Sequence, residues 1–195
     1  MADTPSMYAN ITSLDVHLAS RYFPILVRYA KAREVVYYGD LVEEAKRLYQ
    51  DDPNVQNAIA VSAGRRLDVV RLFTQEHKLL DLTALVIGRT RGEVGSGFPK
   101  GEDPVAIRKE IFNYDWSAVS IQFEGFVVSK ATEIKPRKTR KEPEALQLMS
   151  DFYMANKASL SKNITSQRDF IIDLLKEGFS AEEAYQFAIN NLSGQ

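Results

Sequence analysis

The chain has 195 residues, a net charge of −1, a hydrophobic fraction of 45% and a charged fraction of 26%. This length fits one medium domain with an appendage, and the composition is that of an ordinary globular protein. The absence of cysteine excludes disulfides, thiol nucleophiles and cysteine-ligated zinc. No apolar run approaches the roughly 20 residues that span a bilayer. The N-terminus lacks the basic and apolar regions of a secretory signal, so a cytoplasmic protein without a membrane partner is expected.

The first expected element is an amphipathic helix that Thr12 or Ser13 caps and that runs through about Lys31. Pro24 lies inside it and predicts a kink or a division into two helices. Six apolar positions recur at helical spacing and form one stripe: Leu14, Leu18, Tyr22, Ile25, Leu26 and Tyr29.

The stretch REVVYYGDLVEEAKRLY, residues 33–49, changes its period in the middle. Its β-branched and aromatic first half predicts a strand at 34–38, and the apolar spacing of its second half predicts a helix at 41–49. Asp40 is expected to cap this helix, with Glu43 completing a capping box.

A long helix is expected from the Asp52-Pro53 start signal to about Glu76. Six apolar residues are expected to face the core: Val55, Ile59, Ala63, Leu67, Val70 and Phe73. The positions left toward solvent are Gln56, Asn57, Ala60, Arg65, Asp68 and Arg71.

Residues 81–90, DLTALVIGRT, predict a second strand, and RGEVGSGF at 91–98 predicts a glycine-rich turn. A short helix is expected from Asp103-Pro104 through about Tyr114. The apolar run at 118–129 predicts a further strand.

The composition then changes. Six basic residues lie between Lys130 and Lys141 against the single acidic residue Glu133, so the segment 130–143 predicts an exposed basic linker. A helix at about 144–160 is expected to follow it.

The end of the chain predicts a helical hairpin. Gly178 is expected to end its first helix, and Ser180 with Glu183 forms a capping box for the second. The sequence therefore predicts a helix-rich α+β fold, with a compact domain over 11–129 and an all-helical appendage over 144–192.

The order helix, short strand, helix, longer helix, strand and glycine turn is that of a winged helix, in which 34–38 would pair with 82–88. REVVYYGDL also resembles the strand-to-helix entry of the DNA-binding domain of alkylguanine-DNA alkyltransferases and alkyltransferase-like proteins, where a similar strand ends in Tyr-Gly before a helix. LDLTALVI followed by RGEVGSGF is similar in placement to that family's active-site strand and glycine turn. The resemblance covers about residues 33–98.

The sequence departs from that family at the catalytic motif. Where the family carries Pro-Cys-His-Arg, this chain has Leu82, Thr83, Ala84 and Leu85. Alkyl transfer is therefore excluded and the resemblance implies the scaffold alone. The strand and glycine-rich turn also resemble those of uncharacterised phage and bacterial proteins.

Three segments are candidates for DNA contact, each with a plainer interpretation beside it. The expected recognition helix, about 54–76, offers side chains that read base edges unless they form only a solvated face: Gln56, Asn57, Arg65, Arg66 and Arg71. The wing at 89–100 offers phosphate-binding cations unless its glycines serve only the turn: Arg89, Arg91 and Lys100. The linker offers further cations, unless it is only a solubilising tether: Lys135, Arg137, Lys138, Arg140 and Lys141.

Catalysis has little support in the sequence. His17 has no paired Ser or Cys in a recognisable motif, and His77 ends the long helix, where a cation is favourable in any protein. No enzymatic activity, metal or cofactor is expected.

The apolar face of the C-terminal hairpin is expected to pack on the main domain or on another subunit, because two short helices rarely enclose a core. Its candidate interface residues are Phe170, Leu174, Tyr185 and Phe187.

Two functions remain open at this point. The first is a non-catalytic winged-helix protein that binds DNA, with dimerisation through the C-terminal helices. The second is a protein-interaction module, such as a phage-encoded inhibitor or a subunit of a bacterial defence or regulatory complex. The net charge of −1 favours the second, and the local cations favour the first.

Overall fold

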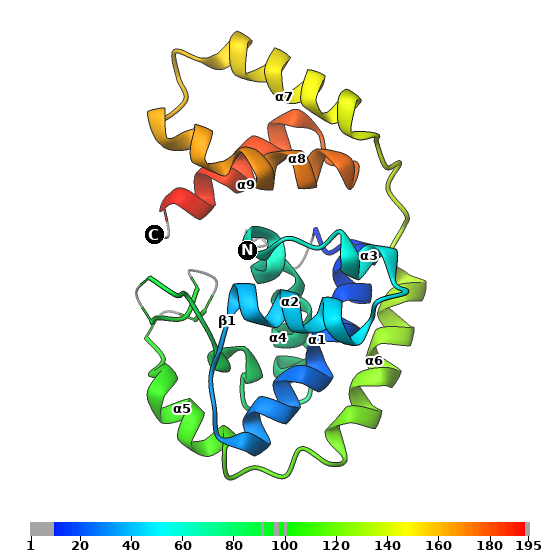
Figure 1. Cartoon of the computed structure of the whole chain (residues 1–195), viewed down its shortest axis with the longest axis vertical. Helices are drawn as coiled ribbons and strands as arrows, with labels where there is room; N and C mark the ends of the chain where they lie inside the picture. Colours follow the sequence, from blue (N-terminus) through cyan, green and yellow to red (C-terminus); the bar gives the residue numbers. More distant parts are fainter. Residues whose placement is uncertain (1–9, 91, 96–97, 100, 194–195) are drawn as a thin grey trace, which may run out of the picture. The chain divides into compact units, whose positions relative to one another are not determined.

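The computed structural model describes residues 10–90, 92–95, 98–99 and 101–193. The chain forms two compact units, residues 1–135 and 136–195. The boundary between them along the chain falls inside the segment predicted as a linker. Each unit has its own hydrophobic core. Figure 1 labels the helices of both units. Both are rich in helix, as the sequence predicts.

The first unit is built around α1, Ser13–Ala32. Thr12 caps it: its hydroxyl accepts from the Asp15 N–H, and the Asp15 carboxylate accepts from the Thr12 N–H at 2.8 Å. Pro24 lies within this helix, which is not divided. α1 ends at Arg33, whose φ of 61° is left-handed.

Two short strands meet beside α1. β1, Val36–Tyr37, pairs in parallel with β2, Val86–Ile87, which confirms the predicted pairing of 34–38 with 82–88. The glycine-rich turn that would form a wing lies partly outside the described residues, so the winged helix stays a prediction.

α2, Tyr38–Leu48, follows β1 directly. Tyr37 is its N-cap residue, and no side chain donates or accepts a capping hydrogen bond there. The predicted capping box of Asp40 and Glu43 is therefore wrong, because the helix begins before both residues.

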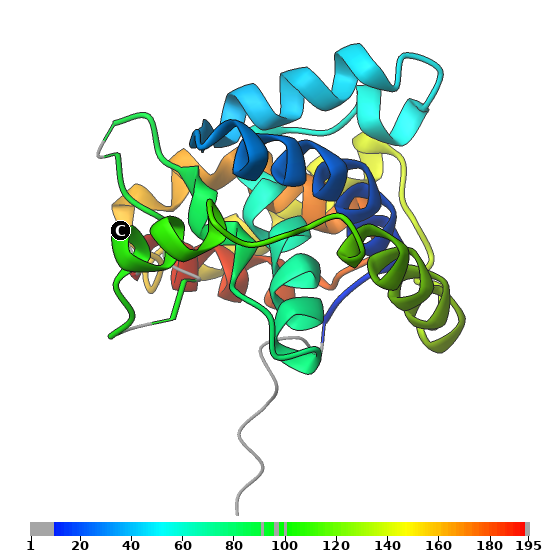
Figure 2. The ribbon, with the colours of Figure 1, turned by 90° about the horizontal axis from the view of Figure 1, so that it is seen from below.

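The predicted long helix at 53–76 is broken. α3, Pro53–Gln56, is a single turn, and a 3-10 helix, Ala60–Ser62, precedes α4, Ala63–Glu76. Asp52 caps α3 as expected. Figure 2 shows α1 between α2 and α4, and α1 packs against both. The helix predicted to read DNA is thus a central element of the core.

Some of the remaining elements of this unit agree with the sequence prediction and others do not. α5, Pro104–Ile111, begins at its predicted Asp-Pro signal. The predicted strand at 81–90 is a 3-10 helix, Leu82–Leu85, followed by β2.

The strand expected at 118–129 is wrong, because these residues form the helix α6, Val119–Glu133. Phe123 and Phe126 are buried one helical turn apart. The Phe123 ring stacks on Phe23 of α1 with 4.0 Å between centroids, and it meets Phe73 of α4 at 4.9 Å. Because a continuous apolar run suits either a strand or a helix, these partners decide the conformation.

The second unit consists of α7, Glu142–Asn156, a 3-10 helix, Lys162–Gln167, α8, Arg168–Lys176, and α9, Ala181–Ser193. Gly178 follows α8 with a φ of +97°, and the predicted Ser180–Glu183 capping box forms through bonds of 2.8 and 3.1 Å. α7 packs on both α8 and α9, so the hairpin has its cover within the same unit.

Candidate functional site

The arginines at the start of α4 point into the protein. Arg66 is 2% exposed, and its Nη1 donates to the Asp15 carboxylate of α1. Arg65 Nη2 donates to the same carboxylate at 2.7 Å. The prediction that Arg65 faces solvent is wrong, and neither side chain is placed to read a base, because each compensates a buried carboxylate.

Arg71 on α4 is also buried. Its guanidinium donates to Asp68, to Asp81 and to the Thr83 hydroxyl, each at 2.9 Å, and so ties α4 to the segment before β2. Burial raises the pKa of Asp68 to about 6, although the Arg71 charge opposes that shift. The predicted DNA contact through Arg71 is therefore wrong, since all three acceptors are intramolecular.

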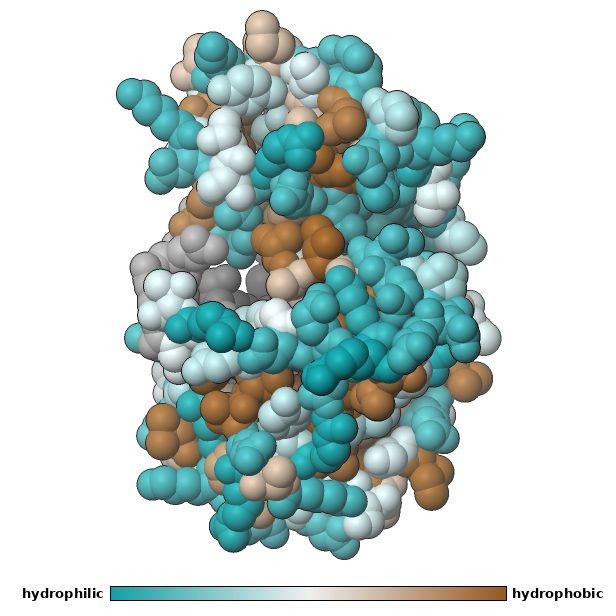
Figure 3. All heavy atoms as spheres, viewed as in Figure 1, coloured by the Kyte–Doolittle hydropathy of each residue, from teal (hydrophilic) through white to brown (hydrophobic). Residues whose placement is uncertain are grey.

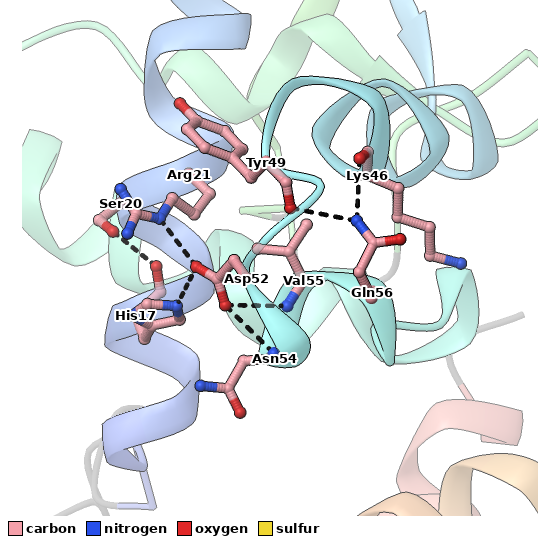
Figure 4. A network of polar contacts seen from close by, with 9 residues as sticks. All are labelled: His17, Ser20, Arg21, Lys46, Tyr49, Asp52, Asn54, Val55 and Gln56. Carbon is pink, nitrogen blue, oxygen red and sulfur yellow. Dashed lines mark hydrogen bonds and ion pairs between the residues drawn. The ribbon is translucent and has the colours of Figure 1, made fainter.

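The predicted amide pair lies at the corner between α2 and α4. Gln56 Nε2 donates to the Lys46 carbonyl at 2.9 Å and to the Tyr49 carbonyl at 3.1 Å (Figure 4). It therefore provides a hydrogen-bond donor for two backbone carbonyl groups at the C-terminal end of α2. Asn57 is exposed at the end of α3. Of the five recognition-helix candidates, Asn57 alone presents a side chain that is both exposed and free of such a structural bond in the described residues.

The same corner holds the network around Asp52 (Figure 4). His17 Nε2 lies 2.7 Å from one Asp52 carboxylate oxygen, and Arg21 Nε donates to the same oxygen at 3.2 Å. Burial raises the pKa of Asp52, but hydrogen bonds from His17 and the backbone outweigh it and leave the pKa below its ordinary value. The nearby Ser20 hydroxyl donates to the His17 carbonyl at 2.6 Å, so the network anchors α3 to α1 without a placed nucleophile.

The predicted wing is only partly described. Arg89 is exposed, lies over the Tyr37 ring at 4.7 Å and donates to Asp40 at 2.6 Å. Arg91 and Lys100 lie outside the described residues. Gly95 lies against Tyr38, because a Cβ at this position would collide with the Tyr38 hydroxyl. The absence of a side chain at Gly95 therefore allows its backbone to lie close to the Tyr38 side chain.

The predicted basic linker, 130–143, is not an exposed segment throughout. Its first residues belong to α6, and Arg137 and Arg140 are half-buried on the helical hairpin. The Arg137 guanidinium lies 4.0 Å from the Phe179 ring centroid, and Arg140 Nη1 donates to the Phe179 carbonyl at 2.7 Å. Three lysines of the segment remain exposed: Lys135, Lys138 and Lys141.

The predicted interface residues of the hairpin form the core of the second unit. Phe170, Leu174 and Tyr185 are at most 5% exposed, and Phe187 packs against this core and meets the Phe179 ring edge-on at 5.6 Å. Their assignment to a partner interface is therefore wrong. α7 packs on α8 and α9 and covers these apolar side chains within the same unit.

A depression on the surface of the first unit has no counterpart among the sites predicted from the sequence. It has a volume of about 560 Å³ and opens between the end of α1 and α5. Its lining combines three basic residues with three apolar ones and a single described carboxylate: Arg33, Arg108, Lys109, Val35, Val105, Phe112 and Glu34. The Arg108-Lys109 pair is visible in the sequence, but nothing local connects it with residues 33–35.

Arg108 is the most unusual group of this depression. Its Nε donates to the Ala84 carbonyl at 2.6 Å. Its Nη2 is buried and has no hydrogen-bond partner among the described residues. Burial lowers the pKa of Arg108, an effect that the Asp103 charge opposes. A buried cationic donor without an acceptor is unfavourable, and burial of this group agrees with the lowered pKa of Arg108.

Other kinds of site find no support in the described part of the chain. It contains no group of three or more His, Asp or Glu side chains placed to hold a metal ion. None of its helices combines the length and the hydropathy that crossing a bilayer requires. Comparisons with protein families, with curated proteins and with solved structures find no match.

Proposed function

We propose that this chain is a non-catalytic protein-interaction module of the cytoplasm. The observation that carries this proposal is the internal position of Arg66 and Arg71, the two α4 cations that a DNA-reading helix would need on its surface. Arg66 is paired with the carboxylate of Asp15, and Arg71 is paired with the carboxylates of Asp68 and Asp81. An inhibitor encoded by a phage, or a subunit of a bacterial defence or regulatory complex, would fit this class.

The outer face of α2 supports the same conclusion. Hydrophilic side chains form a band over this helix in Figure 3, but they carry both signs of charge. Lys46 pairs with Glu43 at 3.0 Å, and Arg89 pairs with Asp40 at 2.6 Å. Duplex DNA requires a surface of predominantly positive charge, because its affinity comes largely from phosphate contacts.

DNA binding is the second candidate function, and a specific observation favours it. Lys135, Lys138 and Lys141 are exposed on one short segment, where they could contact a phosphate backbone without sequence preference. Such binding would depend on residues 135–141 and on no residue of α4.

Binding of the full chain to a random-sequence duplex, measured from about 20 to about 200 mM NaCl, tests the proposal. We expect no salt-dependent binding at micromolar protein. Salt-dependent binding that Lys135→Glu, Lys138→Glu and Lys141→Glu together abolish would replace the proposal with the second candidate. Arg47→Glu, which reverses an exposed charge on α2, is the control for a general change in net charge.

A further inference from the structure

The depression beside α5 has the composition of a recognition site. Its walls are apolar at Val35, Val105 and Phe112, and Val35 and Val105 are 38% and 53% exposed. Exposed apolar side chains around a hollow favour a ligand that covers them.

The charges of the depression indicate the sign of that ligand. Arg33, Arg108 and Lys109 line it, against Glu34 as the acidic lining residue among those described. Arg33 donates to the neutral Asn113 side chain at 2.8 Å, so that bond leaves its positive charge uncompensated. Lys109 adds an exposed ammonium group to the lining. The site therefore favours an anion.

We infer that the depression binds an extended acidic segment of a partner protein, with an apolar side chain against Val105 and Phe112 and a neighbouring carboxylate beside Arg108 and Lys109. This inference rests on the proposed function and names the chemistry of the partner. An acidic peptide satisfies both properties of the site, because one backbone can present an apolar side chain next to a carboxylate.

Nucleic acid fits this site less well. A phosphate backbone would meet the cations but would leave the apolar walls uncovered. An acidic segment with a neighbouring apolar side chain meets both the cations and the apolar walls of the depression.

Selection of random linear peptides displayed on particles, with the immobilised full chain as the target, tests this inference. We expect selected peptides to be enriched in Asp or Glu next to Leu, Ile or Phe. Lys109→Glu and Val105→Asp, both at exposed positions, should each weaken the binding of these peptides at least about tenfold. Arg47→Glu makes the same charge change outside the lining and should leave their affinity unchanged.

The possible results distinguish failure of the proposed binding site from failure of the proposed function. Selected peptides without acidic residues, or peptides that bind Lys109→Glu as tightly as the unaltered chain, would overturn the site while leaving a protein-interaction module in place. Salt-dependent capture of a random DNA duplex that Lys109→Glu abolishes would overturn both. A dimer that Lys109→Glu dissociates, measured by light scattering, would make a second copy the occupant and would also overturn the inference.

Discussion

Two arginines of the first unit and two of the second have contrasting surroundings. In the first unit Arg66 and Arg71 are inside, paired with carboxylates that come from other elements. In the second unit Arg137 and Arg140 lie on the outside of an apolar core and hold the preceding segment against Phe179. The residue type alone therefore does not determine whether an arginine is exposed. Arg66 is buried together with its carboxylate partner Asp15, whereas Arg140 donates to a backbone carbonyl and Arg137 lies over an aromatic ring.

Removing a buried cation should have the largest effect. Arg66→Met is expected to destabilise the first unit by about 3–5 kcal/mol, because it deprives the buried Asp15 of its buried partner. Urea unfolding followed by circular dichroism measures this. Arg47→Met on the exposed side of α2 should change the free energy of unfolding by less than about 0.5 kcal/mol. Equal effects of the two substitutions would contradict the internal role of Arg66.

A charge introduced into the apolar core of the second unit should come next. Leu174 is fully buried, so Leu174→Asp is expected to cost this small unit at least about 3 kcal/mol and to unfold it, with the first unit intact. Amide hydrogen exchange should then show lost protection only within 136–195. Gln186→Asp on the exposed side of α9 is the matched control and should keep that protection. Unchanged amide protection within 136–195 in Leu174→Asp would contradict the burial of Leu174 in the core of the second unit.

Asp68 offers a pH-dependent test of the first unit. Its pKa in the folded protein is about 6 against an ordinary 3.8, so ionisation is less favourable in the folded state than in the unfolded state. Its contribution is therefore most favourable below about pH 4 and declines by up to about 3 kcal/mol as the pH rises through 6.

Asp68→Asn removes this ionisation. We expect the stability of the variant relative to the unaltered chain to improve by up to about 3 kcal/mol between pH 4 and pH 7, as measured by urea unfolding at each pH. Glu124→Gln on the exposed face of α6 provides the control. A relative stability of Asp68→Asn that does not change with pH would show that Asp68 is solvated in the folded protein.

The smallest expected effect separates two glycines. Gly178 has a φ of +97°, and a Cβ there would lie 2.6 Å from the Lys138 carbonyl oxygen, so Gly178→Ala should destabilise the second unit by about 1–3 kcal/mol. Gly125 lies within α6 with open space around it, so Gly125→Ala should stabilise the first unit by up to about 1 kcal/mol. Thermal unfolding of the two variants compares them, and the same sign for both would contradict this distinction.

Predictions that depend on neighbours in the chain were largely correct. Asp52-Pro53 and Asp103-Pro104 do begin helices, and Ser180 with Glu183 does form a capping box. Each involves residues within three positions of one another, so the local sequence contains both partners. The predicted capping box of Asp40 was wrong because α2 begins directly after β1, before Asp40. The position of β1 depends on its parallel pairing with the distant strand β2.

By itself, the sequence determined the helix-rich composition of this protein, the starts of α1, α3 and α5 and the helical hairpin at its end. Only the tertiary structure decided that α6 is a helix, that Arg65, Arg66 and Arg71 turn inward, and that residues 33–35 meet α5 around a cationic depression. The physical reason is the same in each case. A helix cap is satisfied by an adjacent residue, whereas a ring stack, a buried ion pair or a depression requires groups that lie far apart in the chain and meet only when it folds.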